Sequence, residues 1–218
     1  MGGYIATIYD EKSHPYTVYP SQLCKHLFDR FHMNKGMKLL DIGCGRGEFA
    51  NGFKELGLIV NGVEREKIHI DGINVQYLDV EKDPLPYKEK TYDIVFSKSV
   101  IEHLENPSNM LKESRRILKS GGMIIIMAPD WVSQMKIYFD DYTHRTPFTK
   151  TSMNDCLKIH GFKYVNSELI YQLPILWKYP FLAFFSWIIR KLIPVDIKTN
   201  IKFIKWSREL MVLGYGIK

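Results

Sequence analysis

The stretch GMKLLDIGCGRGEFA, residues 36–50, decides the fold, because an apolar run ends in a GxGxG pattern at residues 43–47. The run predicts a strand over Lys38–Ile42, and the residues after the glycines predict a helix over Glu48–Leu56. Glycines at the carboxyl end of a parallel strand let main-chain N–H groups approach a ligand closely. This stretch therefore predicts a nucleotide-type binding turn.

The glycine spacing narrows the class of ligand. A dinucleotide fingerprint reads GxGxxG, but here Glu48 occupies the place of the third glycine. A carboxylate at the start of a helix disfavours an anionic group there and tolerates a cationic one. A pyrophosphate is therefore not the expected ligand.

Two acids follow the next two predicted strands. Glu64 ends the strand predicted over Leu58–Val63, at the place where a carboxylate accepts hydrogen bonds from ribose hydroxyls. Asp79 ends the strand predicted over Asn74–Leu78, where its side chain and the Val80 N–H can read an adenine edge. Together with the glycine turn, these acids predict a nucleoside ligand.

The remaining chain continues to alternate strands and helices, which predicts a parallel sheet with helices on both faces. Further strands are predicted over Tyr92–Phe96, Met123–Met127, Phe162–Tyr171 and Arg208–Lys218, and further helices over Ser21–Met33, Pro107–Lys119 and Thr149–His160. We expect a single domain over residues 1–218, with an N-terminal helical segment (1–35) and an aromatic and basic insertion (172–207) between the last two strands.

Composition and charge restrict the class of protein. The chain has 218 residues, 45% of them hydrophobic and 25% charged, which fits a soluble globular protein and excludes disorder. Its net charge of +6 lies entirely after residue 157, which leaves nucleic acid, anionic lipid or a solvated face as explanations. The three cysteines form no CxxC pair, and the N-terminus lacks a secretory signal, so we expect a cytoplasmic location.

These motifs resemble those of class I S-adenosylmethionine-dependent methyltransferases of the type 11 kind. LLDIGCGRGEFA resembles the first motif of that family, GVERE its ribose-binding acid and YLDVEKDPLPY its adenine-binding acid. YDIVFSKSVIEHLENP, LKSGGMIIIMAP and RELMVLGYG resemble its fourth, fifth and last strands. The resemblance implies an α/β, Rossmann-like, doubly wound sheet of seven strands, mostly parallel with an antiparallel last strand.

The resemblance also implies S-adenosyl-L-methionine as the cofactor and assigns residues to its parts. Asp41 and the glycine turn would hold the amino-acid portion, Glu64 the ribose, Asp79 and Val80 the adenine, and Ser97 would lie beside the methionine. The full expected set is Asp41, Gly43, Cys44, Gly45, Gly47, Glu64, Arg65, Asp79, Val80, Ser97 and His103.

Two histidines lie where the acceptor would be activated. His103 follows the fourth strand, and a structural or cofactor-facing role is favoured for it over that of a base. His144, in FDDYTHRTPFT after the fifth strand, is the candidate catalytic base for a hydroxyl acceptor, with substrate binding and a structural role as alternatives.

Neighbours of His144 complete the expected site. Asp141 would orient the imidazole, and Arg145 and Tyr142 would bind the acceptor. Asp140 and Asp141 could also hold a divalent metal, but the sequence offers no third oxygen ligand, so no metal site is predicted. FSKS after the fourth strand differs from the Asn/Asp-Pro-Pro-aromatic stretch of nucleobase amino methyltransferases, and no nucleic-acid partner is expected.

The insertion from Gln172 to Val195 combines aromatic and basic residues. Its uncharged runs of nine and eleven residues are shorter than the roughly 18–20 that a membrane-spanning helix needs. A helix beginning at Pro180 would be apolar around much of its circumference, so it needs cover. The sheet and helices, an anionic membrane surface at the inner face, or a second copy in a homo-oligomer could supply that cover.

LPILWKYP and DDYTHRTPFT look like segments of methyltransferases associated with bacterial surface-polysaccharide assembly. We therefore expect a small-molecule acceptor, most readily a hydroxyl of a sugar, a sugar nucleotide or a lipid-linked glycan. A quinone or other lipophilic acceptor is the alternative within the same class. A catalytically silent cofactor-binding subunit is the alternative outside it.

Overall fold

The computed structural model describes residues 15–218, and its seven strands form one mixed sheet in the order β3-β2-β1-β4-β5-β7-β6. The strands are β1 (Lys38–Ile42), β2 (Ile59–Glu64), β3 (Asn74–Tyr77), β4 (Tyr92–Lys98), β5 (Leu118–Pro129), β6 (Lys163–Tyr171) and β7 (Leu210–Ile217). β1 pairs in parallel with β2 and β4, β2 pairs in parallel with β3, and β6 pairs antiparallel with β7. The predicted fold class is confirmed.

Helices connect most of these strands, as the alternating pattern predicts. The α-helices are α2 (Tyr19–Arg30), α3 (Glu48–Glu55), α4 (Ser108–Ile117), α5 (Trp131–Gln134), α6 (Lys150–Ile159), α7 (Pro174–Lys178), α8 (Ala183–Leu192) and α9 (Lys202–Arg208). Three short 3-10 helices are η1 (Ile101–His103), η2 (Tyr138–Asp140) and η3 (Pro180–Leu182). None of the helices between residues 15 and 218 combines the length and the apolar character needed to cross a bilayer.

The chain divides into two compact units. The first takes in the chain up to Ser97, Ser108–Ile124 and Lys218, and the second comprises Lys98–Pro107 and Ile125–Ile217. Because β4 and β5 contribute residues to both units, the single-domain organisation stays a prediction. The expected helical segment covers residues 1–35, and its first 14 residues lie outside the described part. The expectation that the chain lacks a secretory signal concerns the same 14 residues.

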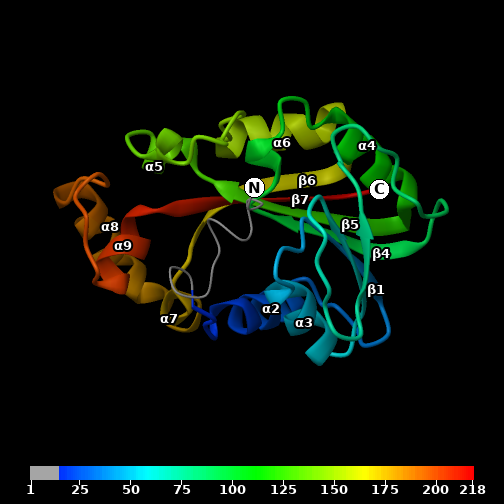
Figure 1. Cartoon of the computed structure of the whole chain (residues 1–218). Helices are drawn as coiled ribbons and strands as arrows, with labels where there is room; N and C mark the ends of the chain where they lie inside the picture. Colours follow the sequence, from blue (N-terminus) through cyan, green and yellow to red (C-terminus); the bar gives the residue numbers. More distant parts are fainter. Residues whose placement is uncertain (1–14) are drawn as a thin grey trace. The chain divides into compact units, whose positions relative to one another are not determined.

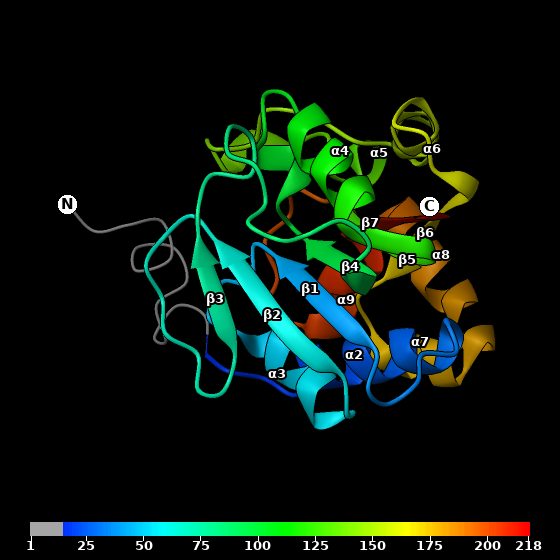
Figure 2. The ribbon, with the colours of Figure 1, turned by 90° about the vertical axis from the view of Figure 1, so that its right-hand side faces the viewer.

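In the first unit, α2 and α3 lie side by side on one face of the strands and α4 lies on the other (Figures 1 and 2). The apolar residues of β1 and β4 are buried between them, with Leu39, Ile42 and Phe96 fully inaccessible to solvent. The ring of Phe96 also packs edge-on against that of Phe53 from α3, with the two ring centroids 5.1 Å apart. This packing fixes the carboxyl end of β1, where the glycine turn begins.

In the second unit, α6 packs against β6 and β7 through Met153 and Leu157, and α8 lies beside α9 (Figure 1). α6 begins with a capping box, in which Thr149 and Ser152 exchange side-chain and backbone hydrogen bonds. Gly161 follows the helix with a positive φ of 82°, as predicted for a helix terminator.

The predicted end of α4 and the predicted start of β5 are wrong, because both depend on contacts with residues distant in the sequence. The helix expected to reach Lys119 ends at Ile117, and β5 begins at Leu118 rather than at Met123. Backbone pairing explains the early strand, because Thr91 N–H donates to the Ile117 carbonyl at 2.7 Å.

Near the end of the chain, Arg208, predicted as the first residue of the last strand, belongs to α9, and β7 begins at Leu210. Arg208 ends this helix, and its guanidinium donates to the carbonyls of Pro194, Ile197 and Ile204. The helix expected to begin at Pro180 starts as the 3-10 helix η3, and α8 follows it.

Candidate active site

The glycine turn after β1 has the conformation that its sequence predicts. Gly43, Gly45 and Gly47 have positive φ angles of 73°, 50° and 82°, which L-residues with a side chain rarely adopt. Gly43 N–H donates to the Val63 carbonyl at 2.8 Å, and Gly47 N–H to the Cys44 carbonyl at 2.8 Å. The buried Cys44 side chain fills the space beside Gly62, so this cysteine acts as a small core residue.

Glu64, at the end of β2, contacts the glycine turn directly. Its Oε2 accepts a hydrogen bond from Gly45 N–H at 2.9 Å, and its Oε1 accepts one from Arg65 N–H at 2.7 Å. Glu66 N–H makes a longer third contact with Oε1, at 3.5 Å. These bonds fix the carboxylate, and Oε2 retains a second lone pair for a ligand hydroxyl. The structure thus brings the expected ribose acid to the expected turn.

Asp41 is the buried acid of this site. Its side chain is 2% exposed, and its Oδ2 has no hydrogen-bond partner among the described residues. Burial, reinforced by the nearby Glu64 carboxylate, raises the pKa of Asp41 to about 8. An unpartnered buried acid of this kind can be paired by a cationic ligand group, such as the ammonium of an amino acid.

Glu48, at the start of α3, does not carry an uncompensated charge. The Arg46 guanidinium lies 2.9 Å from Glu48 Oε2, and it also lies over the Tyr16 ring at 4.5 Å. The repulsion of an anion inferred from Glu48 alone is therefore partly offset. The case against a pyrophosphate rests mainly on the missing third glycine.

Asp79 lies two residues beyond β3 rather than at its end, because the strand stops at Tyr77. Its Oδ1 accepts from Glu81 N–H at 3.0 Å and its backbone N–H donates to Asp83 Oδ2 at 2.9 Å, which form a tight turn. Asn109 of α4 donates to the Val80 carbonyl at 2.9 Å and secures this turn. The adenine contact of Asp79 stays a prediction.

Ser97, near the end of β4, is fully buried, and its hydroxyl donates to the Ile42 carbonyl at 3.0 Å. The bond links the carboxyl ends of β1 and β4, which pair at these residues. A structural role for this hydroxyl is thus established by the contact. Its expected place beside the methionine portion stays a prediction.

In the second unit, a cluster forms where the loop after α5 meets η1. Glu102 of η1 accepts hydrogen bonds at its main-chain carbonyl from Arg145 N–H at 2.7 Å and Thr146 N–H at 3.0 Å. Thr146 Oγ1 donates to the Leu104 carbonyl at 2.7 Å, and Tyr138 Oη donates to the Thr146 carbonyl at 3.0 Å. These bonds hold the loop that carries His144 against η1.

His144 is positioned through one ring nitrogen. Its Nδ1 lies 2.6 Å from the Tyr138 carbonyl, which can only accept, so Nδ1 carries the proton and Nε2 carries the lone pair in the neutral ring. Nε2 lies 3.9 Å from Asp141 Oδ2, and the side chain is 12% exposed. The structure brings His144 and Asp141 together as the sequence predicts.

His103 joins the same cluster through Thr143. Thr143 Oγ1 donates to Asp141 Oδ1 at 2.6 Å and lies 2.9 Å from His103 Nδ1, so His103 Nδ1 is the donor in that second contact. The rings of His103 and His144 have centroids 4.9 Å apart. His103, expected near the cofactor, therefore shares a hydrogen-bonded chain with Asp141.

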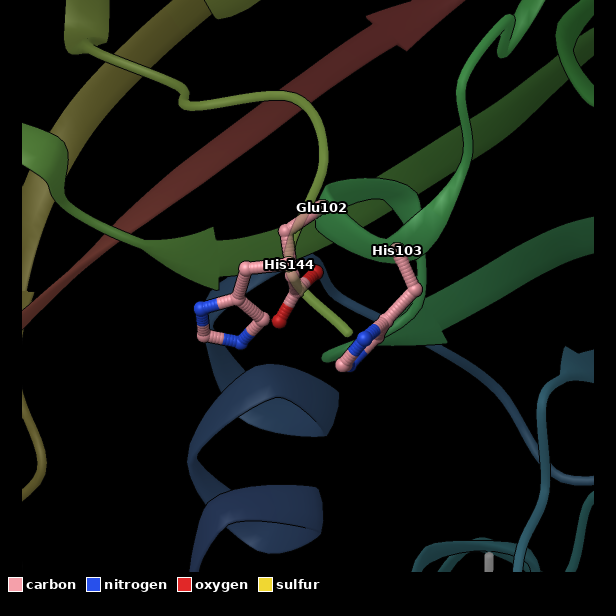
Figure 3. A group of neighbouring side chains, drawn as sticks. All are labelled: Glu102, His103 and His144. Carbon is pink, nitrogen blue, oxygen red and sulfur yellow. The ribbon is translucent and has the colours of Figure 1, made fainter. Parts of the chain in front are cut away.

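Glu102 is the functional candidate that the sequence did not reveal. It is fully buried, neither carboxylate oxygen has a hydrogen-bond partner among the described residues, and burial raises its pKa to about 8. The motif SVIEHLENP contains it beside His103, but only the folded loop shows that it faces His144 as well (Figure 3). Tyr142 and Arg145, the expected acceptor-binding residues, have exposed side chains on this loop.

The insertion between β6 and β7 holds itself together by polar contacts. Ser186 of α8 and Ser207 of α9 are both buried, and their hydroxyls are 2.8 Å apart. Within α8, Ser186 is the one residue that is buried. Large apolar side chains remain exposed on this segment: Ile175, Tyr179, Phe181, Phe184, Phe185, Trp187, Leu192, Ile197 and Ile201.

A Rossmann-like sheet with a GxGxG turn, an acid at the end of β2 and a buried acid in β1 defines a class I methyltransferase that uses S-adenosyl-L-methionine. The chain belongs to the methyltransferase domain family, because the model of that family matches residues 16–167. The protein MJ0638 of Methanocaldococcus jannaschii is 32% identical over 194 residues, which cover 86% of this chain and 81% of that protein.

Two further comparisons concern oxygen methylation and the fold. A ubiquinone biosynthesis O-methyltransferase of Cereibacter sphaeroides is 31% identical over 100 residues, which span 42% of this chain and 40% of that enzyme. A solved SAM-dependent methyltransferase of Archaeoglobus fulgidus superimposes with a TM-score of 0.68 at 21% identity, over 99% of this chain and 100% of that one.

Proposed function

We propose that this methyltransferase transfers the methyl group of S-adenosyl-L-methionine to a hydroxyl oxygen of a small molecule, with His144 as the base. The observation that carries the proposal is the fixed tautomer of His144. Because its Nδ1 is bonded to the Tyr138 carbonyl, Nε2 keeps a lone pair beside the carboxylate of Asp141. A neutral imidazole of this kind is suited to accept a hydroxyl proton near neutral pH.

The reaction is a displacement at the methyl carbon. The acceptor hydroxyl gives its proton to His144 Nε2 while its oxygen bonds to the methyl carbon. The bond from that carbon to sulfur breaks, and its electron pair stays on sulfur, which gives neutral S-adenosylhomocysteine. Asp141 would stabilise the imidazolium, and alignment of the reacting atoms can contribute roughly 7–11 kcal/mol.

The cofactor would be held mainly by residues of the first unit. Asp41 supports this assignment, since its unpartnered buried oxygen fits the ammonium group of the cofactor. Glu64 would accept a hydrogen bond from a ribose hydroxyl at Oε2, with the lone pair that Gly45 N–H leaves. The other proposed contacts are Gly43, Cys44, Gly47, Asp79, Val80, Ser97 and His103.

A test of the base compares two histidines that are anchored in the same way. His144→Ala should lower kcat about 10²- to 10⁴-fold and leave the affinity for S-adenosyl-L-methionine unchanged. His160→Ala is the matched control, because His160 Nδ1 also contacts a main-chain carbonyl, that of Cys156 at 2.8 Å. Equal turnover of the His144 variant and the wild type would remove the assignment.

The acceptor is proposed to be a lipid-linked molecule, with a sugar hydroxyl as the first candidate. Support comes from the DDYTHRTPFT loop, whose Tyr142 and Arg145 side chains are exposed for contact with a sugar or phosphate. A quinol or related lipophilic phenol is the second candidate, favoured by the similarity to a ubiquinone biosynthesis O-methyltransferase.

An assay with each acceptor offered separately distinguishes the two candidates. The protein is incubated with S-adenosyl-L-methionine and either a polyprenyl-phosphate-linked sugar or a prenylated catechol, and O-methylated product is measured by mass spectrometry. Methylation of the sugar supports the first candidate, and methylation of the catechol replaces it with the second. Arg145→Ala should raise KM for the phosphate-linked sugar and not for the catechol.

We also propose that the insertion contacts an anionic membrane surface at the cytoplasmic face, where lipid-linked acceptors reside. Exposed aromatic residues of η3 and α8, including Phe181 and Phe184, accompany a concentrated positive charge. Residues 172–207 contain six bases, Lys178, Arg190, Lys191, Lys198, Lys202 and Lys205, and one acid, Asp196. Each base near such a surface adds about 1 kcal/mol to binding.

Vesicle flotation tests this contact. Vesicles containing phosphatidylserine should carry the protein at low salt, whereas phosphatidylcholine vesicles should not. Phe181→Ser with Phe184→Ser should abolish flotation, and Ile159→Ser, an exposed apolar residue of α6, is the control. Absence of flotation together with a stable dimer in solution would instead assign the surface to a second copy of the chain.

A further inference from the structure

We propose that Glu102, His103 and His144 bind a divalent transition-metal ion. The three side chains come from η1 and from the loop after η2, and one ligand atom of each lies within 4.8 Å of the others. Figure 3 shows the Glu102 carboxylate between the two imidazole rings. Two imidazole nitrogens and one carboxylate are a donor set that suits zinc, manganese, iron or cobalt.

Glu102 gives the strongest reason for an ion at this place. Its side chain is inaccessible to solvent, and both carboxylate oxygens lack a hydrogen-bond partner within the described residues. A buried carboxylate without partners is costly, and a cation is the partner that removes the cost. By contrast, Asp141 in the same cluster is bonded to the backbone and hydroxyl of Thr143.

The contacts of the two rings have the pattern of supported metal ligands. A ligating histidine commonly donates its second ring N–H to a carbonyl or to a group tied to a carboxylate. His144 Nδ1 contacts the Tyr138 carbonyl at 2.6 Å, and His103 Nδ1 contacts Thr143 Oγ1 at 2.9 Å. While these bonds remain, Nε2 is the coordinating nitrogen of each ring.

Three protein ligands leave at least one coordination position for water or for the acceptor hydroxyl. Ligand atoms about 2.1 Å from a tetrahedral ion are about 3.4 Å apart, whereas those of this set lie within 4.8 Å of one another. The side chains would therefore close by up to about 1.4 Å on binding. Asp140 and Asp141, the two acids that the sequence suggests as metal ligands, are not part of this set.

This inference deepens the proposed function and rests on it where the reaction is concerned. In the metal-bound protein His144 Nε2 is a ligand, so it is not the base. With Glu102, His103 and His144 holding an ion, the ion would supply Lewis-acid activation of an acceptor hydroxyl. That hydroxyl would lose its proton to solvent as its oxygen bonds to the methyl carbon and the carbon–sulfur bond breaks. The metal-free and metal-bound proteins thus activate the acceptor in different ways, and His144 takes part in both.

Binding of the metal is measured without any acceptor. Chelator-treated, tag-free protein is titrated with Zn²⁺, Mn²⁺ and Co²⁺ by calorimetry, and the Co²⁺ form is followed by its visible absorption bands. We expect one ion per chain, a loss of affinity of at least about 100-fold in Glu102→Gln and in His144→Ala, and about 10- to 100-fold in Thr143→Val. His69→Ala is the control, because His69 pairs with Asp71 at the surface, and its affinity should equal that of the wild type.

The outcomes for metal and for turnover are distinguishable. Failure of the wild type to bind any of the three ions, or unchanged affinity in a folded Glu102→Gln protein, overturns the metal site. Circular dichroism verifies folding, and the conservative His103→Gln variant provides a second ligand change. Stoichiometric binding without methyl transfer would retain the metal site and reject the proposed function, whereas turnover in protein that binds no ion would do the reverse.

Discussion

The Gly45 amide donates a hydrogen bond of 2.9 Å to Glu64 Oε2, which ties the glycine turn after β1 to the acid that ends β2. Two features that lie 19 residues apart in the sequence are thereby one structural unit. The turn and the carboxylate therefore position each other. The proposed cofactor site is built on this contact.

Removing the charge of Glu64 should weaken cofactor binding. In Glu64→Gln, one amide oxygen replaces two charged acceptors, so either the Gly45 contact or the ribose contacts are lost. We expect the affinity for S-adenosyl-L-methionine to fall about 10- to 100-fold, since hydrogen bonds to charged groups contribute about 1.5–3 kcal/mol. Calorimetry measures it, with the exposed Glu89→Gln as control; equal affinities for wild type and Glu64→Gln would reject the ribose contact.

Cofactor binding should depend on pH through Asp41. Its pKa of about 8 in the free protein means that the acid is mainly protonated at neutral pH. An ammonium group prefers the carboxylate, so binding should release a proton and the affinity should rise between about pH 6 and pH 8. Asp41→Asn should be weaker and lack this dependence. Calorimetry in two buffers of different ionisation enthalpy measures the proton, and zero release by the wild type would contradict the ammonium contact.

The same acid should affect stability in the opposite direction. Because the folded-state pKa of Asp41 is raised, its stabilising contribution is complete below the unfolded value of about 4 and is lost as pH rises toward 8. The cofactor-free Asp41→Asn protein should therefore gain thermal stability relative to wild type over this range. Thermal melts at pH 5 and pH 8 measure the difference, and a gap that narrows at higher pH would contradict the assignment.

A side chain at Gly47 should damage the turn. Its φ of 82° is strained for alanine, and an added Cβ would lie 2.7 Å from Ile70 Cδ1. We expect Gly47→Ala to lose about 1–3 kcal/mol of unfolding free energy and to bind cofactor more weakly. Gly36→Ala, also at positive φ but with open space around it, isolates the steric part of the effect. Identical losses in both variants would show that Ile70 plays no role.

Arg208 should be essential for the insertion between β6 and β7. Its guanidinium is 2% exposed and donates to carbonyls of α9 and of the loop after α8. Arg208→Met should leave these carbonyls without a charged donor and destabilise the segment by at least about 2 kcal/mol. Limited proteolysis should then cut within residues 190–200 faster than in the wild type, and Lys198→Met is the exposed control. An unchanged cleavage rate would remove this role.

Most of the proposed cofactor site can be predicted from the sequence. The strand before Gly43, the glycine conformations and the place of Glu64 all follow from local patterns, because the turn and its strand are adjacent in the chain. The buried state of Asp41 follows from the apolar run around it. Local pattern did not give the end of α4 or the helical state of Arg208, since both depend on partners distant in the sequence.

The proposed acceptor site can be described in full only from the folded chain. The prediction of His144 rests on the acid–base chemistry of imidazole and on its place after the fifth strand, and that of Asp141 on its nearness to His144 in the sequence. Glu102 was missed because an acid beside a histidine in a short loop has no distinctive pattern. Contacts in the folded chain, such as the hydrogen bonds from Arg145 and Thr146 to the Glu102 carbonyl, show that two loops about 40 residues apart form one cluster.

The most direct test of the central claim measures methyl transfer to oxygen. Purified protein is incubated with S-adenosyl-L-methionine carrying a labelled methyl group and with the lipid-linked sugar or the prenylated catechol. The account predicts one S-adenosylhomocysteine per methyl ether formed, with a loss of both products in His144→Ala and in Glu102→Gln. A protein that binds the cofactor but forms no methyl ether from either acceptor, or that methylates nitrogen instead, would contradict it.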